Sequence, residues 1–171
     1  TQSITLTKYD GAVTSSERTP IAGAIFELRK GGEAVKLVKV SDIEYRVATP
    51  EEIAVATVTA FTDETTTMAN NSITTNVRTV AGNDIIVKGL DGDVTYTWVE
   101  TKAPSGYNPT TENKGVTPSK TSVVNTAIEN NKGSVLPSTG GIGTTIFYVI
   151  GVLLVVGSGV AFVTRRRVNA E

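Results

Sequence analysis

The chain has 171 residues, 16 of them basic and 17 acidic, a formal net charge of −1, and neither cysteine nor histidine. No basic patch or run of Lys and Arg interleaved with aromatic residues occurs, so nucleic-acid binding is not expected. The absence of cysteine excludes a disulfide framework, and the absence of histidine removes the commonest general base and metal ligand. We therefore expect no metal and no cofactor, and an enzyme is the least favoured class.

Apolar and polar residues alternate with a period of two between residues 1 and 132, which predicts an all-β sandwich. The expected strands, in chain order, are residues 4–10, 24–30, 34–40, 44–48, 72–77, 85–88, 94–100 and 121–130. Turns are expected at Asp10-Gly11, at Gly31-Gly32 and within residues 89–93. Residues 51–55 are either an edge strand or a short helical turn, and residues 64–71 are expected to be a loop.

One segment of this pattern has a specific motif. Residues 96–107 read YTWVETKAPSGY and resemble the E-box, YxLxETxAPxGY, of the CnaB or SpaA-like (prealbumin-like) domains of Gram-positive fimbrial pilins. Trp98 stands at the position of the usual Leu and keeps it apolar. Residues 4–10, 22–28 and 127–130 resemble the first, second and last strands of the same domains. The resemblance implies a reverse Ig-like sandwich in which an isopeptide bond joins Lys8 to Asn130, with Glu100 as the catalytic acid.

The alternation of side chains supports these three residues independently of the resemblance. Lys8, Glu100 and Asn130 each fall on the apolar, inward face of an expected strand. An amine, a carboxyl and a carboxamide are costly to bury as separate groups, and desolvation favours the neutral amine and the protonated acid. The acid can then polarise the Asn130 carbonyl while the amine attacks it, with loss of ammonia. This is a single self-modification and not enzymatic turnover.

Other interpretations of the same residues stay open at this point. Lys8 can be an edge lysine whose ammonium reaches solvent, and Glu100 can bond to the turn that follows it without taking part in chemistry. Asn131 replaces Asn130 as the bond partner if the strand shifts by one residue, and Asn125 is a weaker option.

The C-terminal region resembles the cell-wall sorting signal of Gram-positive surface proteins. It consists of a pentapeptide, an apolar run over residues 144–164 and a basic stop: Leu136, Pro137, Ser138, Thr139 and Gly140, then Arg165, Arg166 and Arg167. In proteins with this signal, a sortase cuts between the Thr and the Gly, here Thr139 and Gly140, and passes the Thr carbonyl to an amine. At about 1.5 Å per residue, the run spans roughly 31 Å as a helix, enough to cross a bilayer core. The arginines hold that end in the cytoplasm.

The expected organisation is a CnaB-like sandwich over residues 1–132, a linker with the sortase motif over 133–143, a transmembrane helix over 144–164 and a basic tail over 165–171. The resemblance implies a pilus subunit on the Gram-positive cell surface, joined through Thr139 to a neighbouring subunit or to the peptidoglycan cross-bridge. The alternative is a non-polymerised, wall-anchored adhesin stalk. No run like the pilin motif WxxxVxVYPK occurs, and no signal peptide is seen, so we expect a longer, exported precursor.

Overall fold

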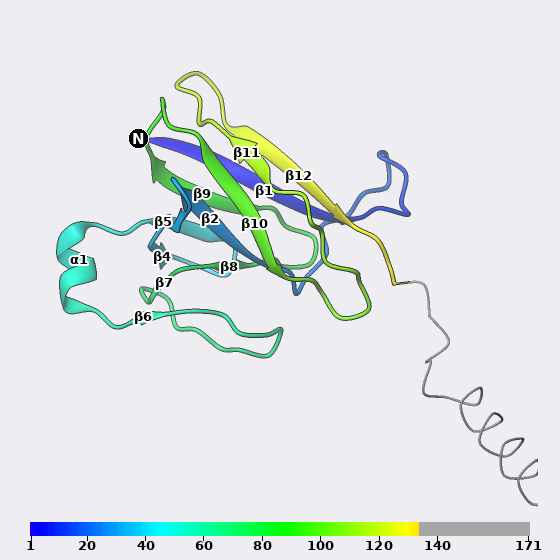
Figure 1. The fold of residues 1–171 in the computed structure, drawn as a ribbon, viewed down its shortest axis with the longest axis horizontal. Coiled ribbons are helices and arrows are strands. Elements are labelled where there is room, and N and C mark those ends of the chain that lie inside the picture. Colours follow the sequence, from blue (N-terminus) through cyan, green and yellow to red (C-terminus); the bar gives the residue numbers. More distant parts are fainter. Residues whose placement is uncertain (134–171) are drawn as a thin grey trace, which may run out of the picture. The chain divides into compact units, whose positions relative to one another are not determined.

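Two β-sheets pack against each other in the part of the chain that the computed structural model describes, residues 1–133 (Figure 1). The expected LPSTG motif, transmembrane helix and arginine stop lie outside the described residues. Between residues 1 and 133, no helix is long and apolar enough to cross a membrane. The all-β class expected from the alternating pattern is confirmed.

The larger sheet has seven strands and the smaller has five. In spatial order, the larger sheet contains β12 (Val124–Asn130), β1 (Gln2–Asp10), β9 (Ile85–Leu90), β5 (Glu44–Val47), β4 (Leu37–Lys39), β7 (Ile73–Thr74) and β6 (Val58–Thr59). The smaller sheet contains β11 (Lys114–Val116), β10 (Tyr96–Lys102), β2 (Ile25–Lys30) and β3 (Glu33–Ala34), and β8 (Val77–Arg78) also pairs with β2.

Two expected strands are each divided between the sheets. The segment expected as one strand over residues 34–40 gives β3 in the smaller sheet and β4 in the larger. The segment expected over residues 72–77 likewise gives β7 in the larger sheet and β8 in the smaller. The prediction of single strands was wrong here, because a chain that crosses between two packed sheets keeps its apolar residues inward on both sides of the crossing.

Other differences concern the ends of strands. β9 continues to Leu90, so the turn expected from residue 89 begins later, and β10 and β12 begin after their expected first residues. The short strands β6 and β11 were not predicted. Residues 64–71 form a loop, as expected.

Residues 50–55 form a short helix, α1 (Pro50–Val55), which settles the choice between an edge strand and a helical turn. Thr49 is its N-cap in a capping box: the Thr49 hydroxyl accepts from the Glu52 N–H, and the Thr49 N–H donates to the Glu52 carboxylate. Pro50 stands in the first turn, where its missing N–H costs nothing. No residue of the helix is fully buried, but Ile53 is partly buried and packs against a small second cluster of Val38, Ala48 and Ile73.

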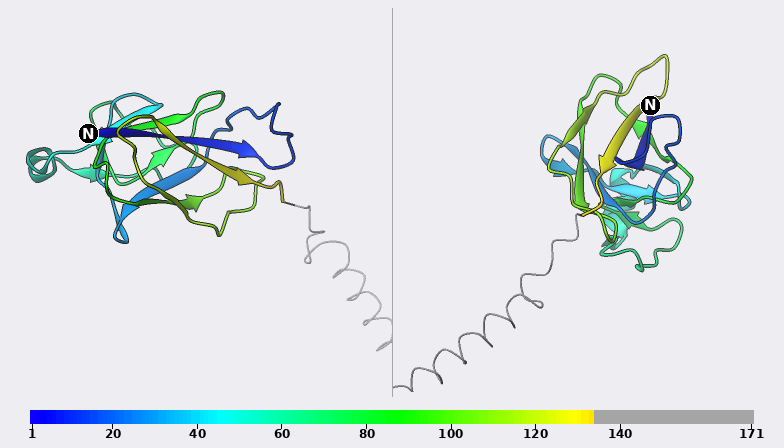
Figure 2. Two further views of the ribbon diagram at one scale, coloured as in Figure 1. Left: turned by 90° about the horizontal axis from the view of Figure 1, so that it is seen from above. Right: turned by 90° about the vertical axis from the view of Figure 1, so that its right-hand side faces the viewer.

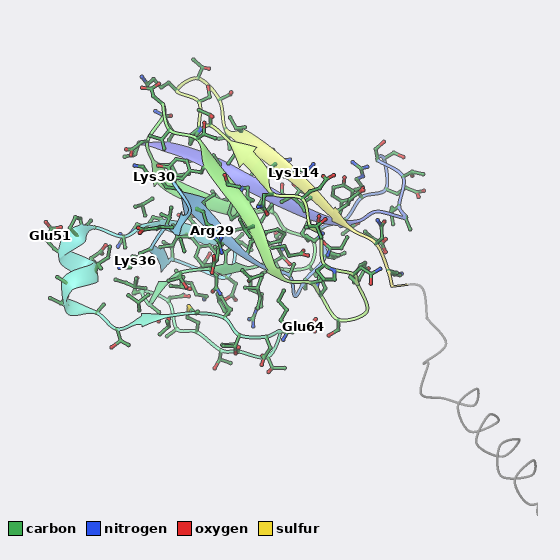
Figure 3. All side chains as sticks on the ribbon, viewed as in Figure 1. Arg29, Lys30, Lys36, Glu51, Glu64 and Lys114 are labelled. Atoms are coloured by element: carbon green, nitrogen blue, oxygen red, sulfur yellow. The ribbon has the colours of Figure 1, made fainter. Side chains whose placement is uncertain are left out.

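The core lies between the sheets and is built from the inward residues of both. Trp98 of β10 is fully buried and meets Phe26 of β2 edge to face, with ring centroids 6.2 Å apart. The aromatic residue at the position where the E-box usually has Leu therefore packs in the centre of the sandwich. By contrast, charged residues such as Lys30, Lys36 and Glu51 lie at the surface (Figure 3).

The first and last strands lie side by side. β1 and β12 run parallel, with Lys8 opposite Ile128 and Asp10 opposite Asn130. The N-terminus lies at one end of the domain, and β12 finishes at the opposite end (Figure 2). Because β1 lies between β12 and β9, Lys8 is in an interior strand of the sheet and not at its edge.

Candidate cross-linking site

The three residues expected to react come together in the core at the C-terminal ends of β1 and β12. Lys8 is 1% exposed and Asn130 is 2% exposed, both in the larger sheet. Glu100 reaches them from β10 in the smaller sheet, and its side chain is 0% exposed. The inward orientation expected for all three side chains is confirmed.

The Lys8 ammonium has few partners for a buried charge. Its Nζ donates to the Ile128 carbonyl at 3.0 Å and lies 4.0 Å from Glu100 Oε2. Burial lowers the pKa of Lys8 from 10.5 to about 8, and the nearby carboxylates, Glu100 foremost, only partly offset this. A neutral amine at this position is therefore accessible near neutral pH.

The Asn130 carboxamide is held by its nitrogen. Nδ2 donates to Glu100 Oε1 at 2.8 Å and to the Asn108 carbonyl at 2.6 Å. Its oxygen, Oδ1, is buried and has no hydrogen-bond partner within residues 1–133, and the same is true of Glu100 Oε2. Two unpartnered oxygens at one buried site are costly unless one of them bears a proton that the other accepts.

The two other asparagines considered from the sequence lie elsewhere. Asn125 and Asn131 are exposed, and Asn125 accepts hydrogen bonds from the hydroxyls of Thr5 and Thr7 on the outer side of β1. Only Asn130 of the three is buried beside Glu100.

The E-box loop supplies contacts that the sequence did not indicate. Ser105 and Gly106 form a turn closed by a hydrogen bond from the Tyr107 N–H to the Pro104 carbonyl, and Gly106 has a φ of 83°, which this type of turn requires. Beyond the turn, the Thr110 N–H donates to Glu100 Oε1 at 2.9 Å. The donors are backbone N–H groups, so the amino-acid types in the loop did not predict these contacts.

Asp10 is a further buried carboxylate next to the site. It accepts from the Ala12 N–H at 2.9 Å and the Tyr107 hydroxyl at 3.0 Å, and Lys132 lies 3.4 Å away. The Ala12 N–H, followed by Tyr107 and Lys132, holds the pKa of Asp10 below its ordinary value. Asp10 therefore stays ionised, whereas Glu100 is expected to act as a proton-donating acid. The pairing of Asp10 with Tyr107, the last residue of the E-box, is the one signal that could have found it.

The site adjoins a pocket at the surface of the domain through Asn130. A surface pocket of about 300 Å³ is lined by residues 108–112 and 129–131. Asn130 forms part of its wall, so a small product formed at the carboxamide has a short route out. In the described part of the chain, no group of three acidic side chains is placed to hold a metal ion.

Two family profiles match this chain. A family profile described as a prealbumin-like fold domain matches residues 2–132, and one described as the LPXTG cell wall anchor motif matches residues 128–170. No match was found among curated proteins.

Two solved structures share the fold. The minor pilin of Streptococcus agalactiae is 19% identical over 78% of this chain and 45% of its own, with a TM-score of 0.54. The shaft pilin SpaA of Lactobacillus rhamnosus GG is 18% identical over 80% of this chain and 49% of its own, with a TM-score of 0.50. The chain thus matches somewhat less than half of the length of each.

The anchor motif places the chain in the Gram-positive cell wall and implies processing by a sortase. Its match also covers the pentapeptide, the apolar run and the arginines expected to form the sorting signal. Together with the match over nearly the whole described region, this shows that the chain belongs to the SpaA family of prealbumin-like fold domains and carries the LPXTG cell wall anchor motif.

Proposed function

We propose that this chain is a structural subunit of a Gram-positive pilus, joined by sortase through Thr139 to a neighbouring subunit or to the peptidoglycan cross-bridge. One observation carries the proposal: a prealbumin-like domain is followed directly by an LPXTG anchor. The names of two structures that share the fold, a minor pilin and a shaft pilin, support it. The alternative is an adhesin stalk that is anchored in the wall but not polymerised.

Covalent assembly in a Gram-positive host that expresses a pilin sortase tests this function. We expect the wild-type chain, exported behind a signal peptide together with the host's own pilins, to appear in the wall fraction as a ladder of high-mass species. Thr139→Ala should abolish every covalently attached form, whereas Ser138→Ala, at the variable position of the motif, should leave the ladder unchanged. A single wall-linked species without a ladder would favour the adhesin stalk, and a wild-type chain that stays fully extractable by detergent would overturn both readings.

Within the domain, we infer that Lys8 and Asn130 form an intramolecular isopeptide bond with Glu100 as the acid. The neutral Lys8 amine attacks Asn130 Cγ, and the Glu100 proton stabilises the oxygen as it gains charge. Glu100 then takes a proton from Nζ and delivers one to Nδ2. The Cγ–Nδ2 bond breaks, the new Nζ–Cγ bond remains, and ammonia leaves with the carboxyl in its starting state.

Burial, the low pKa of Lys8 and the two unpartnered oxygens support this reaction. The bond would join the first strand to the last, in a domain where the N-terminus and the end of β12 lie at opposite ends (Figure 2). Tension along the chain would then pass from residue 8 to residue 130 through a covalent link and would not unfold the strands between them. A cysteine-free surface protein would gain a cross-link that reductants do not break.

The intact mass of the full chain, purified in detergent, tests the cross-link. We expect the wild-type chain to be lighter than its calculated mass by one ammonia, and Lys8→Ala, Glu100→Ala and Asn130→Ala each to have their full calculated masses. Asn131→Ala is the matched control and should lose ammonia like the wild type. A wild-type chain at its full calculated mass would overturn the cross-link and leave the sortase proposal standing.

A further inference from the structure

The two oxygens of the Glu100 carboxyl have different surroundings. Oε1 accepts two hydrogen bonds, from the Thr110 N–H at 2.9 Å and from Asn130 Nδ2 at 2.8 Å. Oε2 is buried and has no hydrogen-bond partner within the described domain, and it is the oxygen that lies 4.0 Å from Lys8 Nζ. One oxygen is thus saturated with donors, whereas the other has none.

This difference determines where a proton can sit. A carboxyl oxygen that already accepts two N–H groups has no free lone pair for a proton, so the acid form must hold its proton on Oε2. Asn130 Oδ1 is likewise buried and accepts no hydrogen bond within the described domain. The N–H···O bond between Nδ2 and Oε1 sets the carboxyl and the carboxamide side by side. A proton on Oε2 that is donated to Oδ1 would give both unpartnered oxygens a hydrogen bond.

We propose that the backbone N–H of Thr110 is a positioning group for the cross-linking reaction, because it occupies Glu100 Oε1 and thereby directs the proton to Oε2. The inference rests on the proposed isopeptide bond. Without this donor, Oε1 would have room for the proton, and the acid could face away from Asn130 Oδ1 for part of the time.

The loop that carries Thr110 is tied to the strands it serves. The Asn108 carbonyl, from the same loop, accepts from Asn130 Nδ2 and so keeps the amide oxygen free. The Asn108 N–H donates to the Asn131 carbonyl at 2.9 Å, and the Gly133 N–H donates to the Gly106 carbonyl at 3.1 Å. These bonds fix the loop to the segment that follows β12. The carboxyl and the carboxamide are thus both held by backbone groups of one loop.

Removing a single N–H tests the proposal. The full chain is made by cell-free synthesis in detergent, with the amide N–H of residue 110 replaced by an ester oxygen, and ammonia loss is followed by intact mass over time. We expect the ester at residue 110 to react roughly tenfold more slowly than the wild type, or slower still. An ester at residue 111 is the matched control, since the Thr111 N–H has no hydrogen-bond partner in residues 1–133 and its loss should not change the rate.

Substitutions give a second route to the same test. Thr110→Pro removes the N–H and should slow the reaction like the ester, whereas Thr110→Ala keeps it and should restore the wild-type rate. If the Thr110→Pro chain is unfolded by circular dichroism, the ester variant decides.

The outcomes separate this inference from the reaction on which it depends. A wild-type chain that loses no ammonia overturns the isopeptide bond itself. A wild-type chain that loses ammonia, together with an ester at residue 110 that reacts at the wild-type rate, overturns the role of Thr110 and leaves the bond in place.

Discussion

Replacing Glu100 by Gln should remove most of the stability that the cross-link provides. Gln keeps the volume of the side chain but cannot hold and transfer the proton, so the bond should not form. The link closes a loop of about 120 residues, for which chain entropy gives a stabilisation of about 5 kcal/mol. In a domain of this size, that loss corresponds to a fall of roughly 15–20 °C in the melting temperature.

Thermal unfolding followed by circular dichroism measures this effect, with mass spectrometry of the same samples to record the state of the bond. The control is the same substitution in the Asn130→Ala chain, which cannot cross-link. There, Glu100→Gln should cost only its local hydrogen bonds, about 1–3 kcal/mol. If the wild type is cross-linked but Glu100→Gln melts within a few degrees of it, or costs as much in the Asn130→Ala background, the assignment of this stability to the cross-link is wrong.

Three further predictions follow from the site and its surroundings. Burial lowers the pKa of Lys8 to about 8, so the attacking amine is mostly protonated below that pH. The rate of ammonia loss should therefore fall as the pH is lowered from 8 to 6, and a rate that does not fall would contradict attack by the neutral amine. Lys39 is also buried and donates to Asn70 Oδ1 at 2.7 Å, but its acid partner Asp42 is 78% exposed, and the hydrogen bond from Lys39 lowers the pKa of Asp42. The mass should therefore show the loss of one ammonia and not two, and Lys39→Ala should not change that loss. Gly106→Ala should destabilise the Glu100→Ala chain by about 1 kcal/mol in denaturant unfolding, because φ is positive there, and an unchanged midpoint would contradict the turn.

The sequence predicted the fold where side-chain alternation and turn residues agree. β1, β2, β10 and β12 are long enough to show a clear period of two, and these strands also carry or neighbour the site. The division of the segments expected as single strands, residues 34–40 and 72–77, between two sheets could not be predicted, because the apolar pattern is the same on both sides of the crossing. β6 and β11 are too short for any periodicity to identify them.

The site was predictable to the extent that it depends on side chains. Lys8, Glu100 and Asn130 fall on inward faces by alternation, and the E-box resemblance selected them from the other charged and amide residues. The carbonyl of Asn108 and the N–H of Thr110 could not be predicted, because every residue except proline has both groups and only the path of the loop brings these two to the site. The buried position of Asp10 was missed because alternation alone did not mark it as part of a site.

Sequencing of the cross-linked peptide shows which two side chains are joined. The full wild-type chain is digested with a protease and its peptides are sequenced by tandem mass spectrometry. We expect a branched peptide in which the Lys8 side chain is joined to the Asn130 side chain, and no linear peptides in which Lys8 and Asn130 are unmodified. A branch at Asn125 or Asn131, or only linear peptides with intact Lys8 and Asn130, would contradict this expectation.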